Sequence, residues 1–132
     1  MANGLYAIFK QRLLDKALDL DTDVIKAVLA DSADYTVNLT THDDLADVAG
    51  AAIVATSSAL TSPTIALGGF DTADFTWSTV TGDVCEIVLL YDDTHASDAL
   101  IVYYDASMTG MPVTPNGGNI NFTVHASGFF AL

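Results

Sequence analysis

The stretch VCEIVLLYDDTHASDALIVYYD, residues 84–105, decides the fold because it holds two β-prone runs joined by a polar link. Residues 84–91 and 99–104 are rich in Val, Ile, Leu and Tyr, as paired β-strands are. Both runs are apolar at consecutive positions, which indicates strands covered on both faces at the centre of a sheet. The polar link is expected to form a protruding loop. Its candidate exposed residues are Asp92, Asp93, His95 and Asp98.

Further short β-prone runs lie on both sides of this hairpin and are separated by turn residues. Before it come AAIVATSSAL, PTIAL and DFTWSTV, and after it comes GNINFTVH. Short runs at this spacing are typical of an antiparallel sandwich. Ahead of the last run, Pro112 and Pro115 stiffen the chain, and the Asn-Gly-Gly at 116–118 favours the positive φ angles of a tight turn. We expect this turn to return the last strand to the sheet in a fixed register.

The first third of the chain adds helical segments. NGLYAIFKQRLLDKALDL has apolar residues at helical spacing, and Asn3 can cap its start. Residues 22–30 predict a strand, and TTHDDLADVAG predicts a short helix. We expect a single domain, 1–132, with a helix at 1–19 and a β-rich body at 20–132. The predicted fold class is mainly β: an antiparallel β-sandwich-like domain with an N-terminal amphipathic helix and one short helix.

The distribution of charge is the most unusual feature of the sequence. The basic residues are Lys10, Arg12, Lys16 and Lys26. All of them lie within residues 1–26, which also contain four acidic residues and therefore have no net charge. The net charge of −13 thus belongs to residues 27–132. Because binding to phosphate groups requires Lys or Arg, we expect neither nucleic acid nor a membrane as a partner. Residues 48–70 carry no charge, but they are too rich in Ser and Thr to span a membrane.

The chemistry-bearing side chains match no established motif. An EF-hand that started at Asp19 would need Gly and Glu where the chain has Val24 and Ala30. The histidines are widely separated, and Cys85 lies within an apolar strand, which favours a packed thiol. We expect no enzyme activity, no catalytic or metal-binding residue and no cofactor. One alternative stays open, a calcium site formed by Asp43, Asp44, Asp47, Asp92 and Asp93.

Four stretches together resemble a family of small virion structural proteins of tailed bacteriophages. They are MANGLYAIFKQRLLD, DLDTDVIKAVLADSADYTVNLTTHDDLADV, VCEIVLLYDDTHASDALIVYYD and GMPVTPNGGNINFTVHASGFFAL, and they cover nearly the whole chain. The resemblance implies a non-enzymatic virion component, with a capsid decoration (cement) protein as the leading expectation. It implies that the partners are the major capsid protein or other virion proteins, and that the chain forms a homo-oligomer or a multi-copy assembly.

Charge narrows the expected location within a particle. Packaged DNA would repel an acidic domain, so we expect the outer capsid surface, or else the neck or tail exterior. The N-terminal residues carry charges where a signal peptide would be apolar, so synthesis in the host cytoplasm is expected. The basic N-terminal helix and the apolar tail GFFAL are candidate docking elements, although the tail could equally complete the domain's own last strand. The candidate docking residues are Leu5, Phe9, Arg12, Phe129, Phe130 and Leu132.

Three alternatives to a decoration protein are considered. A neck, tail or head-fibre component would share the fold and the lack of catalysis. A carbohydrate-binding β module could use a platform of aromatic side chains. The candidate aromatic residues lie in predicted strands, however, which favours packing in the core. The candidate platform residues are Trp77, Tyr91, Tyr103 and Tyr104. An enzyme with a dispersed carboxylate site is the third, and no spacing of the acidic residues favours it.

Overall fold

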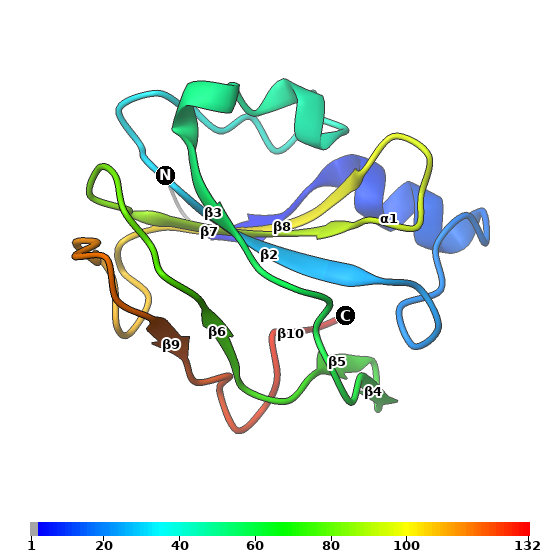
Figure 1. Cartoon of the computed structure of the whole chain (residues 1–132). Helices are drawn as coiled ribbons and strands as arrows, with labels where there is room; N and C mark the ends of the chain where they lie inside the picture. Colours follow the sequence, from blue (N-terminus) through cyan, green and yellow to red (C-terminus); the bar gives the residue numbers. More distant parts are fainter. Residues whose placement is uncertain (1–2) are drawn as a thin grey trace.

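The structure, a computed structural model, describes residues 3–132, so the first two residues of the predicted 1–19 helix lie outside the described part. The fold is mainly β, as the sequence predicts, and every pair of neighbouring strands is antiparallel. A large sheet crosses the middle of the molecule, and smaller strands form a second layer beneath it in the view of Figure 1. The arrangement is therefore sandwich-like.

The large sheet has five strands in the order β1-β8-β7-β2-β3. Their bounds are β1 Gly4–Leu5, β8 Ala99–Tyr104, β7 Ile87–Asp92, β2 Ile25–Ala30 and β3 Ile53–Thr56. The predicted hairpin forms its centre, because β7 pairs with β8 on one side and with β2 on the other. The strand predicted at residues 22–30 begins later, at Ile25.

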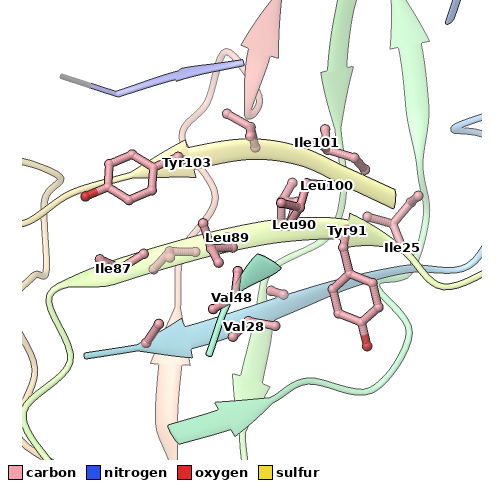
Figure 2. Packing of buried hydrophobic residues seen from close by; sticks show 14 of the residues in the cluster. Ile25, Val28, Val48, Ile87, Leu89, Leu90, Tyr91, Leu100, Ile101 and Tyr103 are labelled. Carbon is pink, nitrogen blue, oxygen red and sulfur yellow. The ribbon is translucent and has the colours of Figure 1, made fainter. Parts of the chain in front are cut away.

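The two central strands are buried along almost their whole length. All six residues of β7 are buried, and five of the six residues of β8 are. Because successive side chains of a strand point to opposite faces, this pattern requires cover on both faces of the sheet. Figure 2 shows part of that core, with Val48 lying over β2 and β7 close to the register pair Val28 and Leu89.

The second layer consists of two small sheets. One has the order β10-β5-β4, and the other pairs β6 with β9. The bounds are β4 Thr64–Ala66, β5 Gly69–Asp71, β6 Phe75–Trp77, β9 Ile120–Phe122 and β10 Phe130–Ala131. The layer is tied to the large sheet by Trp77, whose Nε1 donates a hydrogen bond to the backbone oxygen of Ala27 at 3.1 Å. The hydroxyl of Tyr104 likewise donates to the backbone oxygen of Phe129.

The Asn-Gly-Gly turn is present, but the strand that follows it joins a different sheet from the central hairpin. Gly117 has a φ of 86°, and its N–H donates to the backbone oxygen of Val80 at 2.7 Å. Val80 in turn donates to Gly118 at 3.0 Å. These bonds set β9 against β6, with Ile120 opposite Trp77. The turn thus returns strand β9 to the second layer and not to the large sheet.

The N-terminal helix is shorter than predicted. Helix α1 covers Ala7–Leu14, because Gly4–Leu5 pairs with β8 and Lys16 leaves the helix with a φ of 59°. Asn3 does not cap the helix. Its Oδ1 instead accepts the backbone N–H of Asp105 at 2.6 Å, which ties the start of the chain to the end of β8.

The short helix expected near residues 40–50 is replaced by two 3₁₀ turns, Leu45–Asp47 and Gly50–Ala52. Asp47 holds the first turn, because its Oδ2 accepts the backbone N–H of Asp43 at 2.7 Å and of Asp44 at 3.2 Å. These side-chain bonds compete with regular helical bonding, which is why Asp favours turns. The turns lie on the opposite side of the large sheet from the second layer (Figure 1).

Candidate functional site

The tail GFFAL completes the domain's own second layer. Phe130 pairs with Phe70 in the β10-β5 ladder, and Phe129 donates its N–H to the backbone oxygen of Phe70 at 2.8 Å. Aromatic contacts continue in both directions from this point. Phe129 stacks on Phe122 at 6.2 Å between ring centroids, and Phe130 meets Phe9 edge-on at 5.5 Å. The tail therefore joins the β6-β9 pair to helix α1.

This packing removes Phe9 from the candidate docking residues. Its side chain is fully buried, so it belongs to the domain's own core. Leu5, Phe129 and Phe130 are partly buried and pack against that core. Phe129 and Phe130 are engaged by their neighbours in the same chain, because two aromatic rings in contact exclude water from their shared faces.

Arg12 is also occupied within the chain. Its guanidinium donates to the backbone oxygen of Asp43 and to Oδ1 of Asp44, both at 2.9 Å. The side chain is 15% exposed, so this ion pair fixes the helix to the segment that carries the first 3₁₀ turn. An Arg held by two bonds is poorly placed to reach a neighbour, because both would have to break first.

Leu132 is the one candidate docking residue that is clearly exposed, at 69%. Its N–H donates to the backbone oxygen of Gly68 at 2.8 Å, which places it beside the turn between β4 and β5. Ile65 is 52% exposed and Leu67, at that turn, is completely exposed. We call Ile65, Leu67 and Leu132 the apolar patch. Sequence reasoning missed its first two members, because PTIAL looks like any half-buried strand.

The apolar patch lies on segments of the chain that contain no charged residue. Strand β4 is exposed at all three residues and is an edge strand, so its outer backbone groups can accept another strand. Residues 48–70 and residues 106–132 contain no Asp, Glu, Lys or Arg. Together these segments supply β4, β9, β10 and most of β5. The absence of charged residues from 106–132 is visible in the sequence and could have pointed to this part of the fold.

A second apolar feature is an open pocket of about 500 Å³ beside the β6-β9 pair. It is mostly apolar, although His125 is also part of its lining. Asp74 accepts the N–H of the lining residue Val124 at 2.8 Å, whereas Asp105 lines a separate pocket together with Glu86 and Tyr103. The large lining side chains are Trp77, Tyr104, Met108, Ile120, Phe122 and Phe129.

The predicted exposed loop needs a correction at Asp92. Asp92 is fully buried, and its Oδ1 accepts the N–H groups of Thr94 and His95 at 3.0 and 3.1 Å. The carboxylate thus closes the turn from inside, which explains why it is not exposed. Asp93, His95 and Asp98 are half-buried, and the exposed tip consists of Thr94, Ala96 and Ser97.

Asp92 is electrostatically unusual as well as buried. Its Oδ2 is buried and has no hydrogen-bonding partner among the described residues. Burial, reinforced by the neighbouring carboxyl of Asp23, raises the pKa of Asp92 to about 7. Burial raises an acid's pKa because it penalises the charged form. At neutral pH the side chain is therefore close to half protonated.

The acidic residues considered for calcium do not come together. Asp92 is buried in the loop, and Asp47 is used by the backbone of the first 3₁₀ turn, whose N–H groups lower its pKa. A different trio, Asp31, Asp34 and Asp83, has carboxylate oxygens within 4.8 Å of one another. Asp31 already accepts the N–H of Ala33 at 2.9 Å. Clustered acids alone do not define a cation site, so we assign no metal here.

The aromatic residues considered as a carbohydrate-binding platform do not form an exposed surface in this fold. Trp77, Tyr91 and Tyr103 are at most 5% exposed and belong to the core, and Tyr104 is half-buried in the lining of the pocket. Sugar-binding platforms need exposed ring faces, so these residues do not form one. Cys85 is also buried, as expected, and burial raises the pKa of its thiol to about 11. A thiol with so high a pKa is a poor nucleophile at neutral pH.

Comparison with known proteins does not add an identification. No protein-family model matches the chain, and a search of curated proteins also finds no match. Within residues 3–132, none of the helices has both the length and the apolar composition that crossing a bilayer requires.

Proposed function

We propose that this chain is an outer structural protein of a tailed-phage virion, and specifically a capsid decoration protein. The observation that carries the proposal is the segregation of charge from apolar surface. The net charge is −13, yet the apolar patch lies on segments without a charged residue. A protein built in this way can place its apolar patch on a protein shell and keep most of its acidic residues in solvent. The sequence resemblance to small phage virion proteins supports the same assignment.

The acidic side favours the outer surface of the particle over its interior. Residues 27–132 hold no Lys or Arg, so the chain has few groups that could neutralise DNA phosphates. On the outside, like-charged neighbouring copies repel over only about 8 Å at physiological ionic strength. The two 3₁₀ turns lie on the side opposite the second layer (Figure 1), so the exposed Asp47 at the end of the first turn would face the solvent.

Decoration would stabilise the shell by mass action. A protein that binds only the assembled shell favours it, by about 2.7 kcal/mol per site at a hundredfold excess over Kd. The apolar patch suits such binding in two ways. Its leucine and isoleucine side chains supply apolar area, and the free edge of β4 can pair with a strand of the shell.

The proposal is tested by adding the purified chain to particles that lack it and measuring co-sedimentation. We expect saturable binding to the shell, and we expect Leu67→Asp to weaken it about tenfold or more. Ala46→Asp adds the same charge at an exposed position of the first 3₁₀ turn, on the opposite side, and should leave binding unchanged. Equal binding by Leu67→Asp and the wild type, or loss with Ala46→Asp instead, would contradict the proposed docking side.

A neck, tail or head-fibre component is the second candidate, since the same uncharged side could dock onto those structures. Copy number separates the two. Quantitative mass spectrometry of purified virions should give copies in the hundreds for a shell protein, whereas ring-shaped neck and tail structures would give about six or twelve.

A further inference from the structure

Asp92 combines full burial with a polar atom that lacks a partner. It is the last residue of β7 and has no exposed surface. Its Oδ1 accepts the N–H groups of Thr94 and His95 at 3.0 and 3.1 Å, so the carboxyl is fixed in place. Among the described residues, its Oδ2 is the one buried side-chain oxygen or nitrogen without a hydrogen-bonding partner. Because such an atom destabilises the fold unless something meets it, Oδ2 indicates a bound proton or a ligand.

A second carboxyl, that of Asp23, meets the carboxyl of Asp92 from the segment before β2. Ile25, the first residue of β2, lies opposite Asp92 in the β2-β7 register, which brings Asp23 to the same place. The two carboxyls lie within hydrogen-bonding reach of each other. Oδ2 of Asp23 accepts the N–H of Asp19 at 2.9 Å. Each carboxyl therefore has one oxygen that backbone N–H groups hold and a second oxygen for a shared ligand.

No basic side chain within residues 3–132 forms an ion pair with either carboxyl. The ion pairs in that range are Arg12 with Asp44 at 2.9 Å and Lys26 with Asp93 at 3.1 Å. Two carboxylates in contact repel each other, and burial strengthens the repulsion because the local dielectric constant is low. The contact is therefore stable only when the two groups share a proton or bind a cation.

We propose that a divalent cation of the calcium class binds between Asp23 and Asp92, with Oδ2 of Asp92 as its buried ligand. Calcium prefers oxygen ligands, and two carboxylates balance its charge. Backbone N–H groups that hold the other oxygen of each carboxyl are the usual support of ligating carboxylates. Asp23 is only half-buried, so water can complete the coordination from its side. In calcium-free buffer a proton takes the place of the cation.

The site would join two segments that are distant in sequence. Val24 already links them, because its N–H donates to Oγ1 of Thr94 at 2.7 Å and its backbone oxygen accepts the N–H of Asp93 at 2.8 Å. A bound cation would add a third link between the start of β2 and the loop after β7. The inference is independent of the docking side proposed above, since the site includes no residue of the apolar patch, so the two proposals fail separately.

The first test is calorimetric titration of the full chain with calcium chloride at about 0.15 M salt, which screens diffuse attraction to the acidic surface beyond about 8 Å. We expect saturable binding at one site with a Kd of roughly 10⁻⁴–10⁻³ M, as in weak calcium-binding modules. Asp92→Asn and Asp23→Asn should each weaken it about tenfold or more, because each removes one ligand charge.

Asp34→Asn is the matched control. It removes the same charge from an exposed residue of the trio Asp31, Asp34 and Asp83, and Asp31 follows the opposite end of β2. This variant should leave the Kd unchanged.

A crystal structure of the chain grown with calcium chloride is the decisive test. We expect an ion at about 2.3–2.6 Å from Oδ2 of Asp92, which is the usual distance of calcium from its oxygen ligands. No saturable binding, full binding by Asp92→Asn, equal weakening by Asp34→Asn, or an ion found only at the trio would each overturn the proposal. Asp23→Asn keeps the test valid if the buried substitution disturbs the fold, because Asp23 is half-buried.

Discussion

The large sheet and the second layer are built in different ways from the same chain. Strands β7 and β8 have six residues each and are buried on both faces by aliphatic neighbours. The strands of the second layer have two or three residues, are largely half-exposed, and are held together by aromatic rings brought from distant parts of the sequence. The first region supplies stability through buried area, whereas the second leaves part of its apolar surface exposed.

This difference explains why exposed apolar residues are tolerated in the second layer. The large sheet already buries the main core, so the second layer can leave Ile65 and Leu67 uncovered without losing the fold. Isolated exposed apolar residues are ordinary, but a group of them on segments without a charged residue supports the proposed docking surface. The comparison also ranks the expected effects of substitution, from the central sheet outward.

The largest loss of stability should come from Leu90→Ala in β7. Leu90 is fully buried and pairs with Ala27 on one side and Val102 on the other. Removing its side chain leaves a cavity in the centre of the sheet, so the free energy of unfolding should fall by about 2–5 kcal/mol. Urea denaturation measures this change. A loss under about 1 kcal/mol would mean that the large sheet does not carry the stability.

The next effect concerns the turn that brings the tail into the second layer. Gly128 has a φ of 87°, and a Cβ added to it would lie 2.5 Å from the backbone oxygen of Phe70. Gly110 has a similar φ of 90° with open space around it. Gly110→Ala should cost about 1–2 kcal/mol from backbone conformation alone. Gly128→Ala should cost roughly 1–2 kcal/mol more, because β10 must also shift.

Thermal unfolding of the two glycine variants side by side provides the measurement. Since both substitutions place alanine at a positive φ, their difference isolates the close packing of the tail. Equal losses would show that Phe129 and Phe130 are not anchored as described.

A smaller, pH-dependent effect is expected for Asp92. Its pKa is raised to about 7 in the folded chain from an ordinary value of 3.8. The folded state therefore holds this proton more tightly, so the contribution of Asp92 to stability is greatest below about pH 4, falls as the pH rises toward 7, and is level above that. Asp92→Asn should remove this dependence, because the amide cannot ionise.

At pH 8 we expect Asp92→Asn to be more stable than the wild type, and at pH 4 the gain should vanish. Denaturation curves across this pH range measure it. Asp93→Asn is the control on the neighbouring half-buried residue. A gain that does not change with pH would contradict the assigned titration.

The smallest effect on stability should come from the apolar patch. Ile65→Ser and Leu67→Ser change exposed side chains of the second layer, so each should alter the free energy of unfolding by less than about 0.5 kcal/mol. Chemical denaturation of the isolated chain measures this change. A loss of several kcal/mol would mean that these residues serve the fold and are not a surface for a partner.

Sequence reasoning succeeded where the determining signals are local. The unbroken apolar runs of β7 and β8 identified the central hairpin, and the glycine turn before β9 was visible in the residues themselves. It failed where contacts with residues distant in sequence determine the structure of a segment. The helix at 1–19 was overestimated because Gly4–Leu5 finds a strand partner in β8, which no local pattern reveals.

The candidate site was predicted only in part, for the same reason. The tail was identified as important, but its contacts with Phe9 and Phe70 are tertiary, so its role inside the domain could not be decided from the residues. Asp92 looked like a loop residue because polar residues surround it in sequence, although its carboxylate turns inward to bind Thr94 and His95. The pocket combines residues 77–129 and has no counterpart in any short motif.

We propose that the apolar patch docks onto protein while the two 3₁₀ turns on the opposite side of the large sheet face solvent. A reconstruction of the virion at side-chain resolution would show which side meets the shell. We expect this chain on the outside of the particle, with Leu67 and Ile65 against the shell and the two 3₁₀ turns facing outward. The chain inside the shell against the genome, or outside with the 3₁₀ turns against the shell and Leu67 in solvent, would contradict it.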